Sequence, residues 1–188
     1  MRESIIEEAR AILPEIVELR RALHRNPEVG LELPGTKTLV LESLAGLPLD
    51  IIEHETTGGI VAILSGDSEG PTVLLRGDMD GLPLREDTGL EFASVTGYTM
   101  HACGHDAHTA GLIGAARLLV AARDEGALPG TVRLLFQPSE EGVDDEGKSG
   151  ATRMLENGAL DGVDAAVGLH VGGPLPAGRI FVAPGAIM

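Results

Sequence analysis

Three apolar runs, each leading straight into polar residues, constrain the fold of this chain more than any other feature. Residues 72–77, 131–136 and 165–169 are rich in Val, Leu and Ala without regular alternation, which predicts strands covered on both faces. Between the first two, residues 106–123 place small and aliphatic side chains at helical spacing. Strands that alternate with helices favour a three-layer α/β/α protein with a central, twisted, largely parallel or mixed sheet.

The remaining elements follow from apolar spacing and from turn residues. We predict helices over 3–25, 34–46 and 150–157, and strands over 50–54, 59–65 and 178–182. Pro14 lacks an amide hydrogen and is expected to kink or split the first helix. With three Phe, one Tyr and no Trp, the core has to be aliphatic.

Charge and cysteine content restrict the classes of partner and the compartment. A formal charge of −15 disfavours nucleic acid and anionic membranes, because both would be repelled. A single cysteine cannot form an internal disulfide, which favours a reducing compartment. There is no apolar run of transmembrane length and no apolar core of a signal peptide at the N-terminus. These features favour a soluble, cytoplasmic protein.

Polar side chains stand at the carboxyl end of each of the three apolar runs. Asp78 and Asp80 follow the first, Glu140 and Glu141 follow the second, and His170 ends the third. In open α/β sheets, ligands bind in the crevice outside the carboxyl ends of the strands. We therefore expect these side chains to share one site.

Residues 101–108 add a dense cluster of potential ligands to this site. They contain three histidines, an aspartate and the only cysteine of the chain. Cys103 and His105 are one residue apart, so in extended backbone their side chains point the same way and can share a cation. The alternative is a buried free cysteine with capping histidines. A closed structural zinc site is disfavoured, because it needs four ligands and favours paired cysteines.

The two acidic pairs permit a division of roles. Glu140 and Glu141 are adjacent on a loop, so we expect them to point in different directions. One can then bind a cation while the other accepts a proton from water, although an ordinary acidic loop is the alternative. Asp78 and Asp80 can bind metal directly or fix the tautomer of a ligand histidine. His24, at a helix end, is expected to cap or pack rather than to bind metal.

Four segments, in this order, resemble one family of hydrolases. Residues 75–83, 100–109, 136–142 and 168–171 are similar to motifs of the di-metal amidohydrolase branch of the aminoacylase/carboxypeptidase metallopeptidases. That branch includes N-acyl-amino-acid amidohydrolases, hippurate hydrolases and auxin-conjugate hydrolases. The resemblance runs almost from end to end and implies a zinc-exopeptidase-like fold.

The resemblance also implies roles for particular residues. Cys103 takes the position of a ligand bridging two divalent cations (Zn, Mn, Co or Ni), Glu140 that of the general base, and Asp80 that of a residue supporting the site. The other expected ligands are His105, Glu141 and His170. Asp78 stands where other branches place a metal-binding histidine, so its role as a ligand stays open. Supporting or substrate-side roles are expected for His101, Asp106 and His108.

The expected activity is hydrolysis of the amide bond of an N-acyl amino acid or a similar small conjugate. The resemblance implies that residues 1–188 are the N-terminal part of the catalytic domain. A lid and dimerisation domain, the rest of the catalytic domain and a final metal-binding histidine would lie outside this chain, so a homodimer is expected only of the complete enzyme. Three alternatives stay open: an inactive metal-binding fragment, a dipeptidase or carboxypeptidase, and a redox-sensing cysteine at Cys103.

Overall fold

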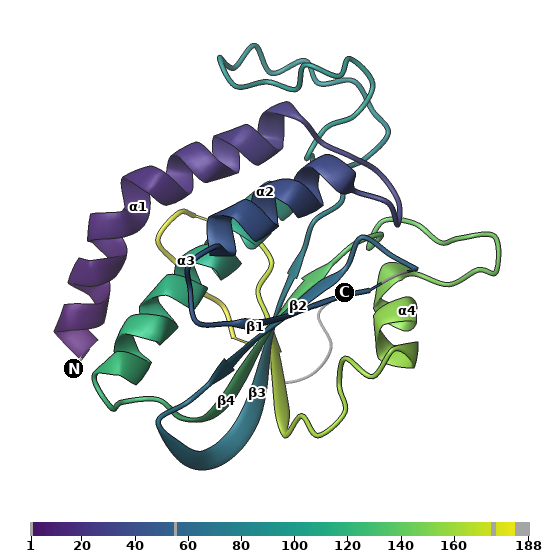
Figure 1. Cartoon of the computed structure of the whole chain (residues 1–188). Coiled ribbons are helices and arrows are strands. Elements are labelled where there is room, and N and C mark those ends of the chain that lie inside the picture. Colours follow the sequence, from purple (N-terminus) through teal and green to yellow (C-terminus); the bar gives the residue numbers. More distant parts are fainter. Residues whose placement is uncertain (1, 55, 174–175, 183–188) are drawn as a thin grey trace.

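The elements follow one another in a pattern close to the one expected from the sequence. The computed structural model describes residues 2–54, 56–173 and 176–182 (Figure 1). Within this part of the chain, the helices are α1 (Arg2–Arg25), α2 (Pro34–Leu44), α3 (His105–Asp124) and α4 (Gly150–Glu156). The strands are β1 (Asp50–Glu53), β2 (Ile60–Ser65), β3 (Ser68–Asp78), β4 (Pro129–Gln137) and β5 (Ala165–Gly168).

The five strands form one mixed sheet in the order β1-β2-β4-β3-β5. β1 and β2 pair antiparallel, as do β2 and β4, whereas β3 runs parallel to both β4 and β5. The carboxyl ends of β3, β4 and β5 therefore meet at the same edge of the sheet. This arrangement brings together the polar residues that follow the three apolar runs, as the sequence predicts.

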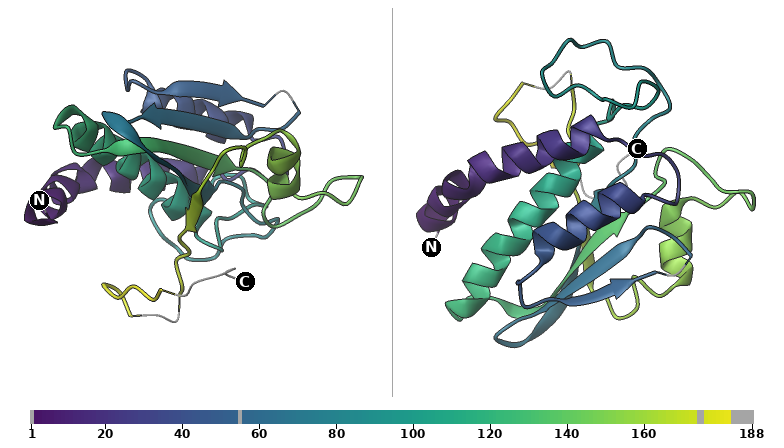
Figure 2. Two further views of the ribbon diagram at one scale, coloured as in Figure 1. Left: turned by 90° about the horizontal axis from the view of Figure 1, so that it is seen from below. Right: turned by 45° about the horizontal axis from the view of Figure 1, so that its top comes forward.

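Aliphatic side chains hold helices on both faces of the sheet, which confirms the three-layer prediction. On one face, α3 lies between α1 and α2 (Figure 2, right). Beneath these helices Ile60, Ala62 and Leu64 of β2 belong to the larger buried cluster. The intervening Val61 points the other way, into a smaller cluster with Met154 of α4. None of the described helices is long and apolar enough to cross a bilayer.

Helix α1 runs unbroken through Pro14, so the expected split of this helix is wrong. The helix packs along α3, where Gly114 leaves room for a close approach. A Cβ at Gly114 would stand 3.4 Å from Ile16 Cδ1. We attribute the continuity to this packing, which offsets the one hydrogen bond that proline removes.

Three further expectations about the strands are wrong. β3 starts at Ser68 rather than at residue 72, because Ser68 pairs with Pro129 before a register shift to Thr72. The described residues 176–182 contain no strand. β5 is exposed along its whole length rather than covered, with Val167 54% exposed, because β3 is the one described element that packs substantially against it.

Candidate metal centre

The carboxyl ends of β3, β4 and β5 bring the expected ligand residues into one region, beside the first turn of α3. The described residues form three overlapping groups of possible ligands, and within each group the donor atoms lie within 4.8 Å of one another. They are Cys103, His105 and His170; His105, Glu140 and Glu141; and Asp78, His105 and His108. His105 belongs to all three groups and is therefore the centre of the site.

His105 is the first residue of α3 and is fully buried. Its Nδ1 lies 3.3 Å from Asp80 Oδ1, while its Nε2 has no hydrogen-bond partner among the described residues. The same Nε2 lies 3.6 Å from Asp78 Oδ2, 3.8 Å from Glu140 Oε2 and 3.9 Å from Glu141 Oε1. A buried ring nitrogen without a partner, facing carboxylates beyond hydrogen-bond distance, is a place where a cation fits.

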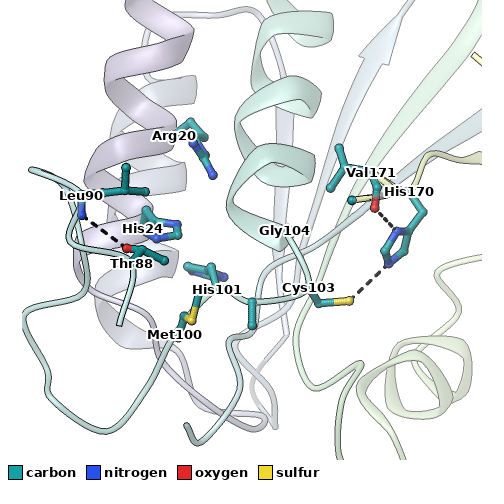
Figure 3. Close-up of a pocket in the computed structure, with 13 residues that line it drawn as sticks. Arg20, His24, Thr88, Leu90, Met100, His101, Cys103, Gly104, His170 and Val171 are labelled. Atoms are coloured by element: carbon teal, nitrogen blue, oxygen red, sulfur yellow. Dashed lines mark hydrogen bonds between the residues drawn. The ribbon is translucent and has the colours of Figure 1, made fainter. Parts of the chain in front are cut away.

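Cys103 contacts His170, and both belong to a candidate group with His105. Cys103 Sγ lies 3.3 Å from His170 Nε2 (Figure 3). The expected extended backbone is wrong, because Gly104 adopts a left-handed conformation with φ 86° as α3 begins. A side chain at Gly104 would also collide with Val171 Cγ2, so this turn requires glycine.

Glu140 and Glu141 converge on His105, so the expectation that they point in different directions is wrong. The preceding Ser139 has a positive φ of 46°, and the backbone N–H of Glu141 donates to Asp80 Oδ2 at 3.0 Å. The two carboxylates differ in exposure instead. The side chain of Glu140 is 41% exposed and that of Glu141 is 24% exposed, so Glu140 is the one more open to a substrate.

The clustered carboxylates determine the protonation of the metal-free site. Burial raises the pKa of Cys103 to about 12, helped by a hydrogen bond with Glu141 and by the charges of Glu141, Glu140 and Asp78. Burial lowers the pKa of His105, but Asp80, Asp78 and Glu140 outweigh it and leave this pKa raised. The Cys103 thiol therefore keeps its proton near pH 7, and a cation has to compete with protons for both Cys103 and His105. Such an environment opposes the reactive thiolate that a redox-sensing cysteine needs.

A second buried network lies beside the centre. His24 Nδ1 is 2.7 Å from Asp106 Oδ2, which also pairs with Arg20 Nε at 2.7 Å. His24 Nε2 is 3.2 Å from Glu86 Oε1. This network joins α1, α3 and the loop after β3. Sequence reasoning missed Arg20 and Glu86, which nothing but their charge distinguishes from surface residues.

A pocket of about 620 Å³ opens between this network and the Cys103–His170 pair (Figure 3). Its lining includes Leu90 and Val171 as well as His101. Burial lowers the pKa of His101 to about 4, although Asp106 acts in the opposite direction, so the imidazole is neutral near pH 7. The pocket offers space for a small molecule next to the candidate ligands.

Comparison with known proteins identifies the family. The family model of peptidase family M20/M25/M40 matches residues 74–185, which include every candidate ligand. The chain belongs to peptidase family M20/M25/M40.

Several M20 relatives match over nearly the whole of this chain. The N-acetyl-L-cysteine deacetylase of Bacillus subtilis is 41% identical over 93% of this chain and 40% of its own length. Thermostable carboxypeptidase 1 of Saccharolobus solfataricus is 40% identical over 99% of this chain and 46% of its own. Among solved structures, the YXEP protein of Bacillus subtilis is named a dinuclear metal binding peptidase from the M20 family. Its crystal structure matches with a TM-score of 0.81 and 40% sequence identity, over 89% of this chain and 45% of that one.

These matches confirm the recognition made from the motifs, including the amidohydrolase branch, whose N-acyl-amino-acid and auxin-conjugate hydrolases are among the matched relatives. They also confirm the catalytic-domain-like fold. The chain spans less than half the length of the M20 relatives named above.

Proposed function

We propose that this M20 chain carries the metal centre of an amidohydrolase that cleaves the amide bond of N-acyl amino acids or similar small conjugates. One observation carries the proposal: two carboxylates of unequal exposure face the unpaired Nε2 of the buried His105. This arrangement provides a ligand and a proton acceptor side by side. The N-acyl-amino-acid hydrolases among the relatives supply the substrate class.

In this proposal Cys103, His105, Glu141 and His170 hold two divalent cations. Bound divalent cations would polarise the substrate carbonyl and acidify the attacking water. Asp80 orients two of the ligand residues, because one oxygen faces His105 Nδ1 and the other accepts the backbone N–H of Glu141. With its proton held on Nδ1, His105 presents the lone pair of Nε2 to the cation.

Glu140 is the proposed general base. Its carboxylate removes the proton from the attacking water and returns it to the leaving amine nitrogen. Its greater exposure supports this division, because the base has to reach substrate while Glu141 stays at the centre. Neutral His101 and the adjoining pocket would accept the acyl or amino-acid part of the substrate.

We further propose that residues 1–188 form the N-terminal part of a catalytic domain. Support comes from the relatives, of which less than half is matched. An inactive metal-binding fragment remains the alternative to an active chain, since four ligand side chains are few for two cations. Cleavage of dipeptides is the second candidate activity, favoured by the 40% identity to a carboxypeptidase.

The deciding experiment compares three substrate classes after the chain has been loaded with Zn²⁺, Mn²⁺, Co²⁺ or Ni²⁺. N-acetyl and N-benzoyl amino acids test the proposed activity, dipeptides test the second candidate, and the Glu140→Gln variant controls for contaminating hydrolases. Turnover of the acyl amino acids by the wild type alone supports the proposal. Turnover of dipeptides only would replace it, and bound metal without any turnover would identify an inactive fragment.

A further inference from the structure

The segment that carries His170 is the least buried part of the candidate centre. β5 is exposed throughout, and both His170 and Val171 are exposed as well. By contrast, His105 is fully buried. Packing alone therefore positions His170 far less firmly than it positions His105, and some other contact has to hold the exposed ligand in place.

His108 makes such a contact from the second turn of α3. The backbone N–H of Val171 donates to His108 Nε2 at 2.9 Å, while His108 Nδ1 lies 2.6 Å from Asp78 Oδ1. A backbone N–H can only donate, so His108 Nε2 has to be the acceptor. The proton of the ring then stands on Nδ1 and is donated to the Asp78 carboxylate. Both nitrogens of His108 are therefore already in use.

The next link of this chain of hydrogen bonds reaches His170. Its Nδ1 lies 2.7 Å from the carbonyl oxygen of Val171, which can only accept, so the proton of His170 is on Nδ1. The lone pair of Nε2 then points to Cys103 Sγ at 3.3 Å and accepts a hydrogen bond from the thiol in the metal-free site (Figure 3). The Val171 backbone is thus held at its N–H by His108, and its carbonyl sets the tautomer of His170.

Asp78, at the start of this series of hydrogen bonds, is well anchored. Asp78 is fully buried at the end of β3 and pairs with Arg76 Nη1. The hydroxyl of Thr109 donates to the backbone carbonyl of Asp78 at 2.8 Å, which ties β3 to α3. A rigid carboxylate therefore fixes His108, and through it the exposed segment.

We propose that His108 is a positioning residue that aligns His170 for cation binding through the backbone of Val171, and that it is not itself a ligand. The inference rests on the proposed function, in which His170 binds metal. It assigns Asp78 and His108, which form a candidate group with the ligand His105, to support of the centre rather than to a separate metal site. Losing such a supporting contact typically weakens metal affinity by about 10–100-fold.

A matched pair of variants separates the two hydrogen bonds of His108. In His108→Asn, the amide stands at the position of Nδ1, so it can donate to Asp78 but does not reach Val171. In His108→Gln, the amide oxygen stands near the position of Nε2 and can accept the N–H of Val171. Zn²⁺ affinity, measured by competition with a chromophoric chelator, is expected to fall about 10–100-fold in the Asn variant and to stay close to that of the wild type in the Gln variant. Equal losses in both variants, or no loss in the Asn variant, would overturn the proposal.

A measurement on the metal-free wild type tests the geometry without any substitution. Nitrogen NMR is expected to show His108 protonated on Nδ1 only, with a scalar coupling between its Nε2 and the amide nitrogen of Val171. A protonated Nε2, or no coupling, would refute the inference even if both variants fold. Should the wild type bind no Zn²⁺, the proposed function fails, whereas the NMR result still decides whether His108 holds this segment.

Discussion

Two candidate ligands of this centre, His105 and His170, are held in opposite ways. His105 is fully buried at the start of a 20-residue helix and contacts Asp80 directly. His170 is exposed, follows a four-residue edge strand and is oriented by a backbone carbonyl. The difference indicates that one half of the centre is part of the core, while the other half depends on a few hydrogen bonds. Substitutions in the two halves should therefore have different consequences.

Replacing each histidine by alanine gives the largest expected contrast. His105→Ala should abolish cation binding and, because it removes the histidine partner of the buried Asp80, lower the free energy of unfolding by about 3–5 kcal/mol. His170→Ala should also impair cation binding but change stability by less than about 0.5 kcal/mol, as expected at an exposed position. Urea unfolding with chelator present measures both values. Equal destabilisation by the two variants would contradict the division of the centre into a buried and an exposed half.

Glu140→Gln tests the exposed carboxylate. Because glutamine cannot accept the proton of the attacking water, turnover should fall about 100–10,000-fold while the bound metal is retained. Metal content by elemental analysis and the rate with an N-acyl amino acid are measured on the same sample. Retained turnover would remove Glu140 from the role of base, and lost metal would make it a ligand instead.

Asp80→Asn tests the direct support of the buried half. The amide can no longer orient His105 and Glu141 as a charged acceptor, so cation affinity should fall about 10–100-fold. Chelator competition provides the measurement. The exposed Asp87→Asn, on the loop after β3, is a matched control that should leave affinity unchanged; an equal effect of both substitutions would point to net charge rather than to orientation.

The smallest expected effect is on the pH dependence of the metal-free chain. The pKa of His105 is raised in the folded state, because its carboxylate neighbours outweigh the opposing effect of burial. Its stabilising contribution is therefore complete below the unfolded pKa of about 6.5 and is lost as the pH rises through the folded value. Cation binding should change in the opposite direction, because it requires deprotonated ligands. Urea midpoints between pH 6 and 9, with and without Zn²⁺, should diverge; parallel curves would contradict the raised pKa.

The general position of the centre could be predicted from the sequence because strand direction determines it. Asp78, Glu140 and His170 follow apolar runs, and parallel pairing of β3 with β4 and β5 brings such strand ends to one edge. The directions of the side chains next to Ser139 and Gly104 could not be predicted, because both residues adopt a positive φ. Residue spacing alone does not specify such backbone conformations.

Other features depend on contacts that residue types do not encode. The exposure of β5 reflects the absence of substantial packing by any described helix over this edge strand, and such packing is a property of the whole fold. The contact of Glu86 with His24 spans 62 residues and joins a loop to a helix. The hydrogen bond from Val171 to His108 could not be predicted either, because its donor is a backbone N–H. Every residue other than proline has such a donor.

The central claim is that the edge formed by β3, β4 and β5 is a metal centre, and the stoichiometry of cation binding tests it most directly. Elemental analysis of the chain after loading with Zn²⁺ and removal of excess metal should find two cations per chain in the wild type. The number should fall in Cys103→Ser, which removes the ligand proposed to bridge them. A wild-type chain that retains no metal, or a Cys103→Ser variant that retains as much as the wild type with the same affinity, would contradict the account.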